Sequence, residues 1–248
     1  QGENPKIYGM VRKGDDITTA IQADFAVTDA RTGATTVLGA IPLPPNPYGL
    51  GGVSGILNFI GEMTPEGDFI FPAISARINP FTFQIEQYTV YIGTINVGNH
   101  GNGSNVSYEV LNIDASCDVY MDACVEAFRA YALNPAGREP SGGIQDWTLS
   151  PDGRYLYSFL GIENALLKID LSTNTAFCTP GPNSNLAFTG TVGAQTDEFG
   201  GLYYEGNTLY GWQVDRGRVF EINTSTAGLS LITSGLPLDY RGDNSTCL

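Results

Sequence analysis

Hydrophobic residues along this chain fall into short runs that end at turn-forming residues. In one such run, Leu166, Leu167 and Ile169 are interrupted only by Lys168 before the chain reaches a polar turn at Asp170. Runs of this length, bounded by Gly, Pro, Asp or Asn, predict β-strands, and their blurred alternation is typical of strands that are covered on both faces. The pattern therefore predicts many short strands.

The same order of turns and strands recurs along the chain. Gly153 in an Asp-Gly turn returns as Gly206 in a Glu-Gly turn, and Asp170 returns as Asn223, in both cases 53 residues later. An acid followed by Gly suits a tight hairpin, and Asp or Asn before Ser or Thr folds its side chain back onto backbone N–H groups. Looser copies of the unit begin in residues 7–11 and 62–71.

Each copy is predicted to contain four strands: an inner strand, an aromatic-rich second strand, a third that ends in Asp or Asn, and a fourth. Repeated four-stranded units of this length are typical of a β-propeller. We therefore predict an all-β fold, a single β-propeller of four or five four-stranded blades over residues 1–248. The blade-like units are residues 7–44, 56–97, 98–143, 144–181 and 192–235, followed by a tail at 236–248.

The unit at 98–143 fits the repeat worst and is predicted to be a degenerate fifth blade. A radial core is expected from apolar and aromatic residues of the repeated strands: Ile7, Tyr157, Leu167, Ile169, Leu209, Tyr210, Val219 and Ile222. The first unit has no inner strand before Ile7.

Composition and charge exclude two classes of partner. Among 248 residues, 26 Asp and Glu outweigh 12 Lys and Arg, which gives a net charge of −14. Such a chain lacks the basic surface that binds phosphates, so nucleic acid is not an expected partner. No apolar run approaches the length of a membrane-spanning helix, so membrane insertion is not expected either.

Four cysteines, Cys117, Cys124, Cys178 and Cys247, predict disulfides rather than a zinc site, because none forms a C-x-x-C pair and the chain has one histidine. Three pairings are possible. We favour Cys117 with Cys124, which flank a short polar loop, and Cys178 with Cys247.

Four N-x-S/T sequons, at Asn102, Asn105, Asn223 and Asn244, lie among turn-forming residues and are candidate glycosylation sites. The chain also opens at Gln1 without a Met, as a mature secreted chain would. Together with paired cysteines and few lysines, these features predict a secreted or cell-surface protein.

The C-terminal half resembles a known family in residues 144–153, 166–173, 199–203 and 242–247. These segments are similar to a domain-of-unknown-function family of secreted β-propeller-like repeats found in surface and cell-wall proteins. The resemblance implies propeller architecture and a role in adhesion or structure without established catalysis. It also implies that Cys247 forms a structural tie.

Three carboxylates are candidate metal ligands. Glu62, Asp146 and Glu198 precede or begin inner strands, so a propeller would bring them toward its central channel, where Ca²⁺ accepts oxygen ligands. The alternative, which we favour, is that each accepts hydrogen bonds from backbone N–H groups of a neighbouring blade. His100, in a Gly- and Asn-rich loop, is expected to be a solvated side chain rather than a general base.

Two further motifs suggest binding. Aromatic side chains could form a sugar-stacking surface, although inter-blade core is the commoner role: Trp147, Trp212, Tyr203, Tyr204 and Tyr210. Arg241, Gly242 and Asp243 spell an integrin-binding tripeptide, for which a simple turn is the default interpretation.

These observations favour a non-catalytic extracellular structural or adhesion glycoprotein. Its possible partners are glycans, cell-surface proteins, or other copies of itself that pair with an open blade edge at residues 7–12 and form a filament. The alternative to self-assembly, which we favour, is that the chain closes this blade itself or that a longer polypeptide completes it. The alternatives are a propeller lyase or hydrolase, or a carbohydrate-binding lectin-like module, that uses channel carboxylates and a bound metal.

Overall fold

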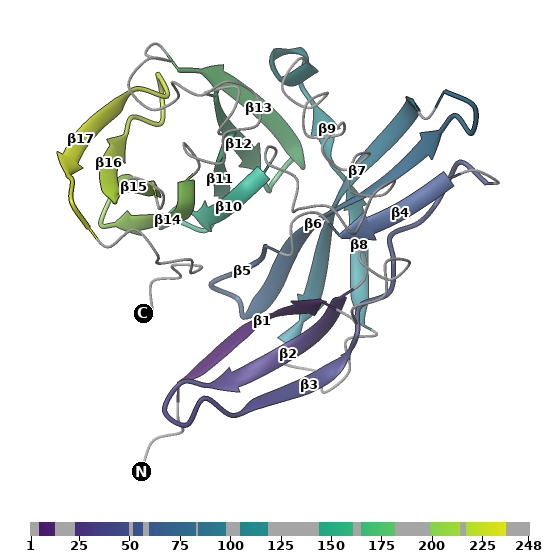
Figure 1. Cartoon of the computed structure of the whole chain (residues 1–248), viewed down its shortest axis with the longest axis horizontal. Coiled ribbons are helices and arrows are strands. Elements are labelled where there is room, and N and C mark those ends of the chain that lie inside the picture. Colours follow the sequence, from purple (N-terminus) through teal and green to yellow (C-terminus); the bar gives the residue numbers. More distant parts are fainter. Residues whose placement is uncertain are drawn as a thin grey trace. The chain divides into compact units, whose positions relative to one another are not determined.

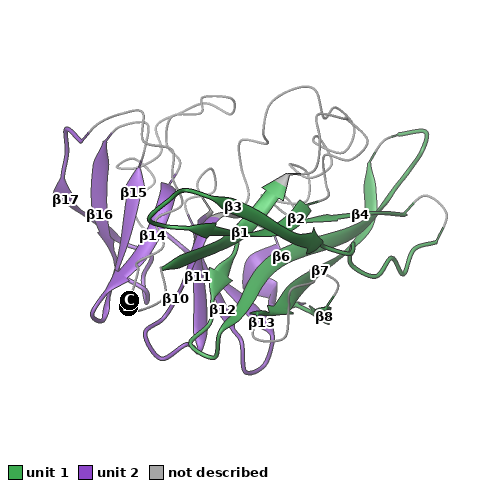
Figure 2. Ribbon diagram, turned by 90° about the horizontal axis from the view of Figure 1, so that it is seen from below, with its two compact units in different colours: residues 1–111, 129–137 green, residues 112–128, 138–248 purple. Residues whose placement is uncertain are grey.

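The structure is a computed structural model. It describes residues 5–12, 23–49, 52–56, 60–82, 84–97, 105–118, 144–160, 165–181, 199–213 and 217–236. The elements described are the strands β1 to β17 and one 3-10 turn, η3 (Ala115–Cys117). The chain divides into two compact units (Figure 2), which comprise residues 1–111 with 129–137 and residues 112–128 with 138–248.

The first unit contains two antiparallel sheets (Figure 1). The first sheet has the order β1-β2-β3, with strands β1 (Lys6–Arg12), β2 (Ala23–Asp29) and β3 (Thr35–Ala40). The second sheet has the order β4-β6-β7-β8, with strands β4 (Gly52–Ile56), β6 (Asp68–Ile78), β7 (Ile85–Asn96) and β8 (Val106–Val110). The short strand β5 (Glu62–Met63) pairs with the beginning of β6 and β4 with its end, because β6 is long enough for both.

The second unit also contains two sheets. The third sheet has the order β10-β11-β12-β13-β9, with strands β10 (Ile144–Leu149), β11 (Tyr155–Leu160), β12 (Ala165–Asp170), β13 (Thr175–Pro180) and β9 (Asn112–Ile113). The fourth sheet has the order β14-β15-β16-β17, with strands β14 (Phe199–Glu205), β15 (Thr208–Gln213), β16 (Arg218–Ile222) and β17 (Leu229–Thr233). All pairings are antiparallel except that of β9 with β13.

The predicted fold class is confirmed: the protein is all-β, of the propeller type, with four blade sheets in the described part of the chain. The segment expected to form a degenerate fifth blade, 98–143, contributes strands to other sheets. Its strand β8 pairs with β7 over five residues, and β9 pairs with β13. No helix among the described residues is long and apolar enough to cross a membrane.

The same side-chain turn occurs in every sheet. An Asp or Asn at the end of a strand accepts hydrogen bonds through Oδ1 from backbone N–H groups two or three residues later: Asp29, Asn79, Asp170 and Asn223. In three of these turns the residue four positions on has a left-handed φ: Gly33 at 70°, Asn174 at 48° and Ala227 at 53°. The repeat predicted from the sequence therefore reflects one hydrogen-bonded turn that recurs in each sheet.

The predicted core is confirmed in part. Tyr157, Leu167, Ile169, Leu209 and Ile222 are buried. The other three are not core residues. Ile7 is 46% exposed because it lies on an edge strand, and Tyr210 and Val219 are half-buried on the outward face of the fourth sheet. Between the third and fourth sheets, the cluster that forms the core includes Phe159, Leu166, Phe199 and Phe220.

Candidate functional site

Asp146 joins the inner strands of the two sheets of the second unit. Its side chain is 5% exposed; Oδ1 accepts a hydrogen bond from the Trp147 N–H at 2.9 Å, and Oδ2 accepts one from the Leu202 N–H, on β14, at 2.6 Å. Charge-assisted bonds of this kind are among the stronger ones in proteins. The carboxylate therefore fastens the third sheet to the fourth, as the alternative to metal binding predicted.

The other two candidate metal ligands are Glu62 and Glu198. Glu62 lies in the first unit, where its Oε1 accepts a hydrogen bond from the Met63 N–H at 3.1 Å. Glu198 lies outside the described residues. Within the described ranges, no group of three or more His, Cys, Asp or Glu side chains is arranged to hold a metal ion.

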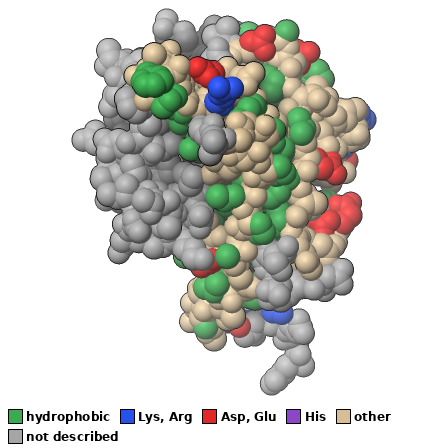
Figure 3. Space-filling view, turned by 90° about the vertical axis from the view of Figure 1, so that its right-hand side faces the viewer, with side chains coloured by type: hydrophobic (Ala, Val, Ile, Leu, Met, Phe, Trp, Pro, Cys, Tyr) green, Lys and Arg blue, Asp and Glu red, His purple; other side chains and the backbone are tan. Residues whose placement is uncertain are grey.

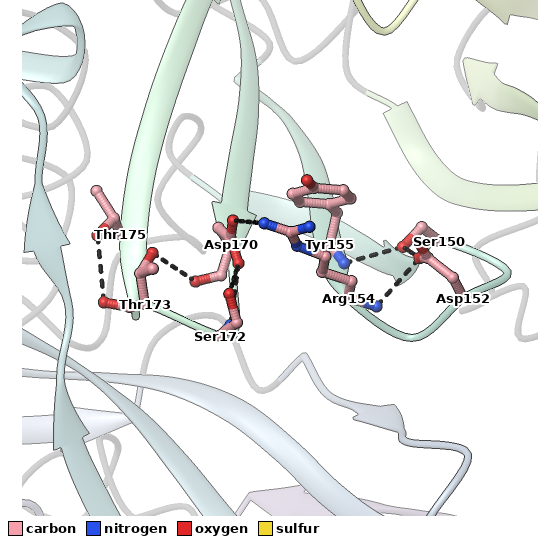
Figure 4. Close-up of polar contacts among 8 residues, drawn as sticks. All are labelled: Ser150, Asp152, Arg154, Tyr155, Asp170, Ser172, Thr173 and Thr175. Atoms are coloured by element: carbon pink, nitrogen blue, oxygen red, sulfur yellow. Dashed lines mark hydrogen bonds and ion pairs between the residues drawn. The ribbon is translucent and has the colours of Figure 1, made fainter.

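A polar cluster lies at the turns of the third sheet (Figure 4). Ser150 Oγ donates to Asp152 Oδ1 at 2.5 Å and accepts a hydrogen bond from the Tyr155 N–H at 2.9 Å. Asp152 Oδ1 also accepts from the Arg154 N–H at 3.1 Å, and these bonds hold the pKa of Asp152 below its ordinary value. The Pro-Asp-Gly turn is thereby closed by its own side chains.

Arg154 links this turn to the next turn of the same sheet. Its guanidinium donates to Asp170 Oδ2 at 2.9 Å, while Asp170 Oδ1 accepts from the backbone N–H and the hydroxyl of Ser172 at 3.0 and 2.6 Å (Figure 4). Arg154 and Ser172 lower the pKa of Asp170 to about 2. The cluster is a structural clamp. The sequence repeat did not reveal it, because the position equivalent to Arg154 in the fourth sheet is Asn207.

The aromatic residues predicted to form a sugar-stacking surface do not all lie on one face of one sheet. Tyr203 and Tyr210 stack on the fourth sheet, with ring centroids 5.4 Å apart and planes 21° apart. Tyr204 points to the opposite face, where its ring lies 6.0 Å from that of Tyr157. Trp147 is 1% exposed in the third sheet and offers no surface to a ligand.

Both favoured disulfide pairings, Cys117 with Cys124 and Cys178 with Cys247, are wrong. Cys117 is bonded to Cys178, 61 residues away, and not to Cys124. The bond forms because β9 brings η3 alongside β13: the Asn112 N–H donates to Asn174 O at 2.7 Å and the Asp114 N–H to Ala176 O at 3.0 Å. We call residues 112–117 the strap. Cys124 and Cys247 lie outside the described residues.

The remaining predicted sites divide between exposed and undescribed positions. Asn105 and Asn223 are both exposed, and Asn223 Oδ1 accepts the turn hydrogen bonds from Ser225 and Thr226 at 3.0 and 3.1 Å. The other predicted residues lie outside the described ranges: His100, Asn102, Asn244, Arg241, Gly242 and Asp243.

No family model and no curated protein matches this chain in sequence, so the family resemblance stays a prediction. Solved structures with a similar arrangement include a streptogramin B lyase, 13% identical over 92% of this chain and 55% of the lyase chain, with a TM-score of 0.40. A calcium-binding regucalcin from Agrobacterium tumefaciens strain C58 is 13% identical over 92% of this chain and 59% of its own, with a TM-score of 0.39.

The major allergen Mala s 1 of Malassezia sympodialis is 10% identical over 85% of this chain and 56% of its own, with a TM-score of 0.42. This chain therefore spans between 55% and 59% of the lengths of these three proteins.

Proposed function

We propose that the protein is a non-catalytic extracellular structural or adhesion module that joins other copies of itself through strand β1. The observation that carries this proposal is the first sheet, which has three described strands with β1 at one edge. Two apolar side chains of β1, Ile7 and Val11, are each 46% exposed. A strand edge with apolar side chains readily pairs with another chain.

The third sheet shows how this protein covers an edge. The strap pairs with the outer strand β13, adds a hydrogen bond from the Cys178 N–H to Ser116 Oγ at 3.1 Å, and is fixed by the disulfide. Proteins usually protect edges in such ways because unpaired N–H and C=O groups invite aggregation. Among the described strands, none pairs with the outer edge of β1, and this favours a partner strand there.

The opposite edge of the first sheet supplies a complementary surface. Its strand β3 carries Val37, which is 55% exposed. Pairing of β1 from one copy with β3 of the next is a heterologous contact, and heterologous contacts that do not close give filaments. This geometry supports a filament in preference to a two-fold dimer.

The carboxylates of the second unit support a structural role. Asp146 binds backbone N–H groups of two strands, and Asp170 binds Arg154 and Ser172. Each carboxylate therefore stabilises the fold through contacts that engage both of its oxygens.

An extracellular location is supported by the disulfide and by exposed sequons. Disulfides persist in oxidising compartments. Asn105, just before β8, and Asn223 are both exposed, so a glycan at either is compatible with the described fold. Acidic side chains along the margin of the face in Figure 3, with few Lys or Arg among them, agree with the net charge of −14.

Light scattering over a concentration series tests the assembly. We expect the average mass of the wild type to rise with concentration, and more steeply at high salt, because salt screens the repulsion between acidic copies. Ile7→Glu with Val11→Glu, and separately Val37→Glu, should each keep the protein monomeric. Phe177→Glu is the matched control, because Phe177 is 40% exposed on β13, whose edge the strap already covers.

Two results would contradict the proposal. A wild-type monomer at every concentration and salt would reject the assembly. Free thiols together with an unmodified mass at Asn105 and Asn223, for protein secreted from a eukaryotic host, would reject the extracellular glycoprotein.

A further inference from the structure

One face of the fourth sheet carries a row of aromatic and polar side chains that crosses all four of its strands. The two tyrosines of the row are half-buried and the other two residues are exposed. The strand registers place the row in this order from β14 to β17: Tyr203, Tyr210, Glu221 and Ser230. We call these four residues the tyrosine row. It begins with a stacked pair of rings and ends in groups that hydrogen-bond to hydroxyls.

The opposite face of the same sheet forms the core of the second unit. Leu209, Phe220 and Ile222 are each at most 3% exposed and pack with Phe159 and Leu166 of the third sheet. Since side chains alternate along a strand, the tyrosine row points away from this core. The row is therefore not needed to hold the third and fourth sheets together.

At two positions this face carries a hydroxyl residue where the third sheet has an aromatic one. Tyr157, the equivalent of Tyr210 in the repeat, is only 6% exposed, because its face packs against the fourth sheet. The neighbours Tyr155 and Phe177 of that face correspond to hydroxyl residues in the fourth sheet, Thr208 and Ser230. The fourth sheet keeps the tyrosine and carries these two hydroxyl residues together with Glu221 on the same face. This combination of an aromatic ring with hydrogen-bonding groups favours a polar ligand.

Tyr203 is the residue best placed to contact a ligand. It lies on β14, the edge strand of the sheet order, so the ring side away from Tyr210 is not covered by another strand of this sheet. Glu205 projects from the same face two residues later and is exposed. Burial raises the pKa of Tyr203, and the charges of Glu205 and Tyr210 raise it further, so its hydroxyl remains a donor at neutral pH.

We propose that this face binds a neutral oligosaccharide, with a pyranose ring stacked on Tyr203 and its hydroxyls donating to Glu205 and Glu221. The apolar C–H face of a pyranose suits an aromatic ring, and carboxylates accept hydrogen bonds from sugar hydroxyls. The charge of the site selects against anionic sugars, because two carboxylates on a chain of net charge −14 repel them. This binding activity goes beyond the proposed assembly and does not depend on β1.

Native gel electrophoresis in gels that contain a polysaccharide is the test, since an acidic protein migrates readily and is retarded by a polymer that it binds. The neutral probes are a soluble β-glucan and a mannan, and the anionic probe is polygalacturonate. We expect retardation by at least one neutral polymer and none by polygalacturonate. Titration calorimetry with an oligosaccharide of the retarding polymer then gives the Kd.

The variants separate binding from folding. Tyr203→Ala should raise the Kd at least about tenfold, whereas Tyr203→Phe, which keeps the ring, should change it much less. Glu205→Gln should weaken binding without affecting the fold, because Glu205 is exposed. Tyr48→Ala, at a half-buried tyrosine of the first unit, is the matched control and should bind like the wild type.

The proposal is overturned if no neutral polymer retards the wild type, or if Tyr203→Ala and Glu205→Gln both bind unchanged. It is also overturned if Tyr203→Ala abolishes a concentration-dependent mass without any effect of sugars, since the face would then pack against protein.

Discussion

At the scale of single residues, two buried serines differ in whether their hydroxyl groups are hydrogen-bonded. Ser75 is fully buried, and its Oγ bonds to Ser54 Oγ at 2.7 Å and to the carbonyl of Pro45 at 2.6 Å. Ser158 is 1% exposed, and its Oγ has no hydrogen-bond partner among the described residues. It lies opposite Trp147, whose indole N–H likewise has none there. A buried polar atom without a partner keeps its desolvation cost.

This contrast predicts opposite effects of the same substitution. Ser158→Ala should raise the free energy of unfolding by about 1 kcal/mol, and Ser75→Ala should lower it by about 1–2 kcal/mol. Urea denaturation of both variants measures the difference. A clear loss of stability in Ser158→Ala would contradict the prediction and would indicate a buried water on that hydroxyl.

The lowered pKa of Asp170 gives the fold a specific sensitivity to acid. The charged carboxylate is stabilised in the folded chain, so its contribution is complete above the unfolded pKa of about 4. It is lost as the pH falls through the folded value of about 2. The stability difference between wild type and Asp170→Asn should therefore be constant above about pH 5 and shrink toward pH 2.

Urea denaturation of the wild type and Asp170→Asn at several pH values checks this expectation. Arg154→Gln is the companion variant, because Arg154 is the largest cause of the lowered pKa. In that variant the carboxyl resonance of Asp170 should titrate closer to the ordinary value. A stability difference independent of pH down to 2 would contradict the assignment.

At the scale of elements, the strap depends on the disulfide more than on its strand. The strand β9 has two residues, and its pairing alone is too short to persist. The disulfide closes a loop of 61 residues, for which chain entropy gives a stabilisation of about 4 kcal/mol. Replacement of Cys117 and Cys178 by Ser should therefore lower the free energy of unfolding by up to this amount.

Hydrogen exchange localises the effect. The amides of Asn112 and Asp114, which donate to the carbonyls of Asn174 and Ala176, should exchange much faster in the double variant. The amide of Leu171, which bonds to Arg154 O at 3.0 Å between two turns of the same sheet, serves as the internal control and should exchange as before. Equal protection of all three amides would show that the strap holds without its disulfide.

The elements also show where the sequence was informative. Turn residues set the strand boundaries of the repeat, since Gly153, Gly206 and Asn223 occupy the expected turns. Asn79 forms the same turn in the second sheet but was not identified, although Thr82 matches the Thr found three residues after Asp29, Asp170 and Asn223. The pairing of β4 with the end of β6 has no sequence signal, since it joins strands through long-range contacts alone.

At the scale of the whole molecule, the propeller class followed from repetition, whereas the pairing of distant segments did not. Four cysteines permit three pairings, and only the position of η3 beside β13 decides that Cys117 bonds to Cys178. The candidate binding face behaves similarly. Its tyrosines were identified from composition, but the sequence did not indicate that Glu221 and Ser230 lie in the same row, because register depends on the folded sheet.

The strap has a mechanical consequence if the chain is pulled at its two ends. Tension transmitted along the chain from β8 enters the second unit at Asn112 and reaches Cys117 a few residues later. There the covalent bond passes the force directly to Cys178. The strands β10, β11 and β12 lie inside the bridged loop and bear none of it. In the oxidised state, stretching would therefore extend the fourth sheet while most of the third sheet stays folded.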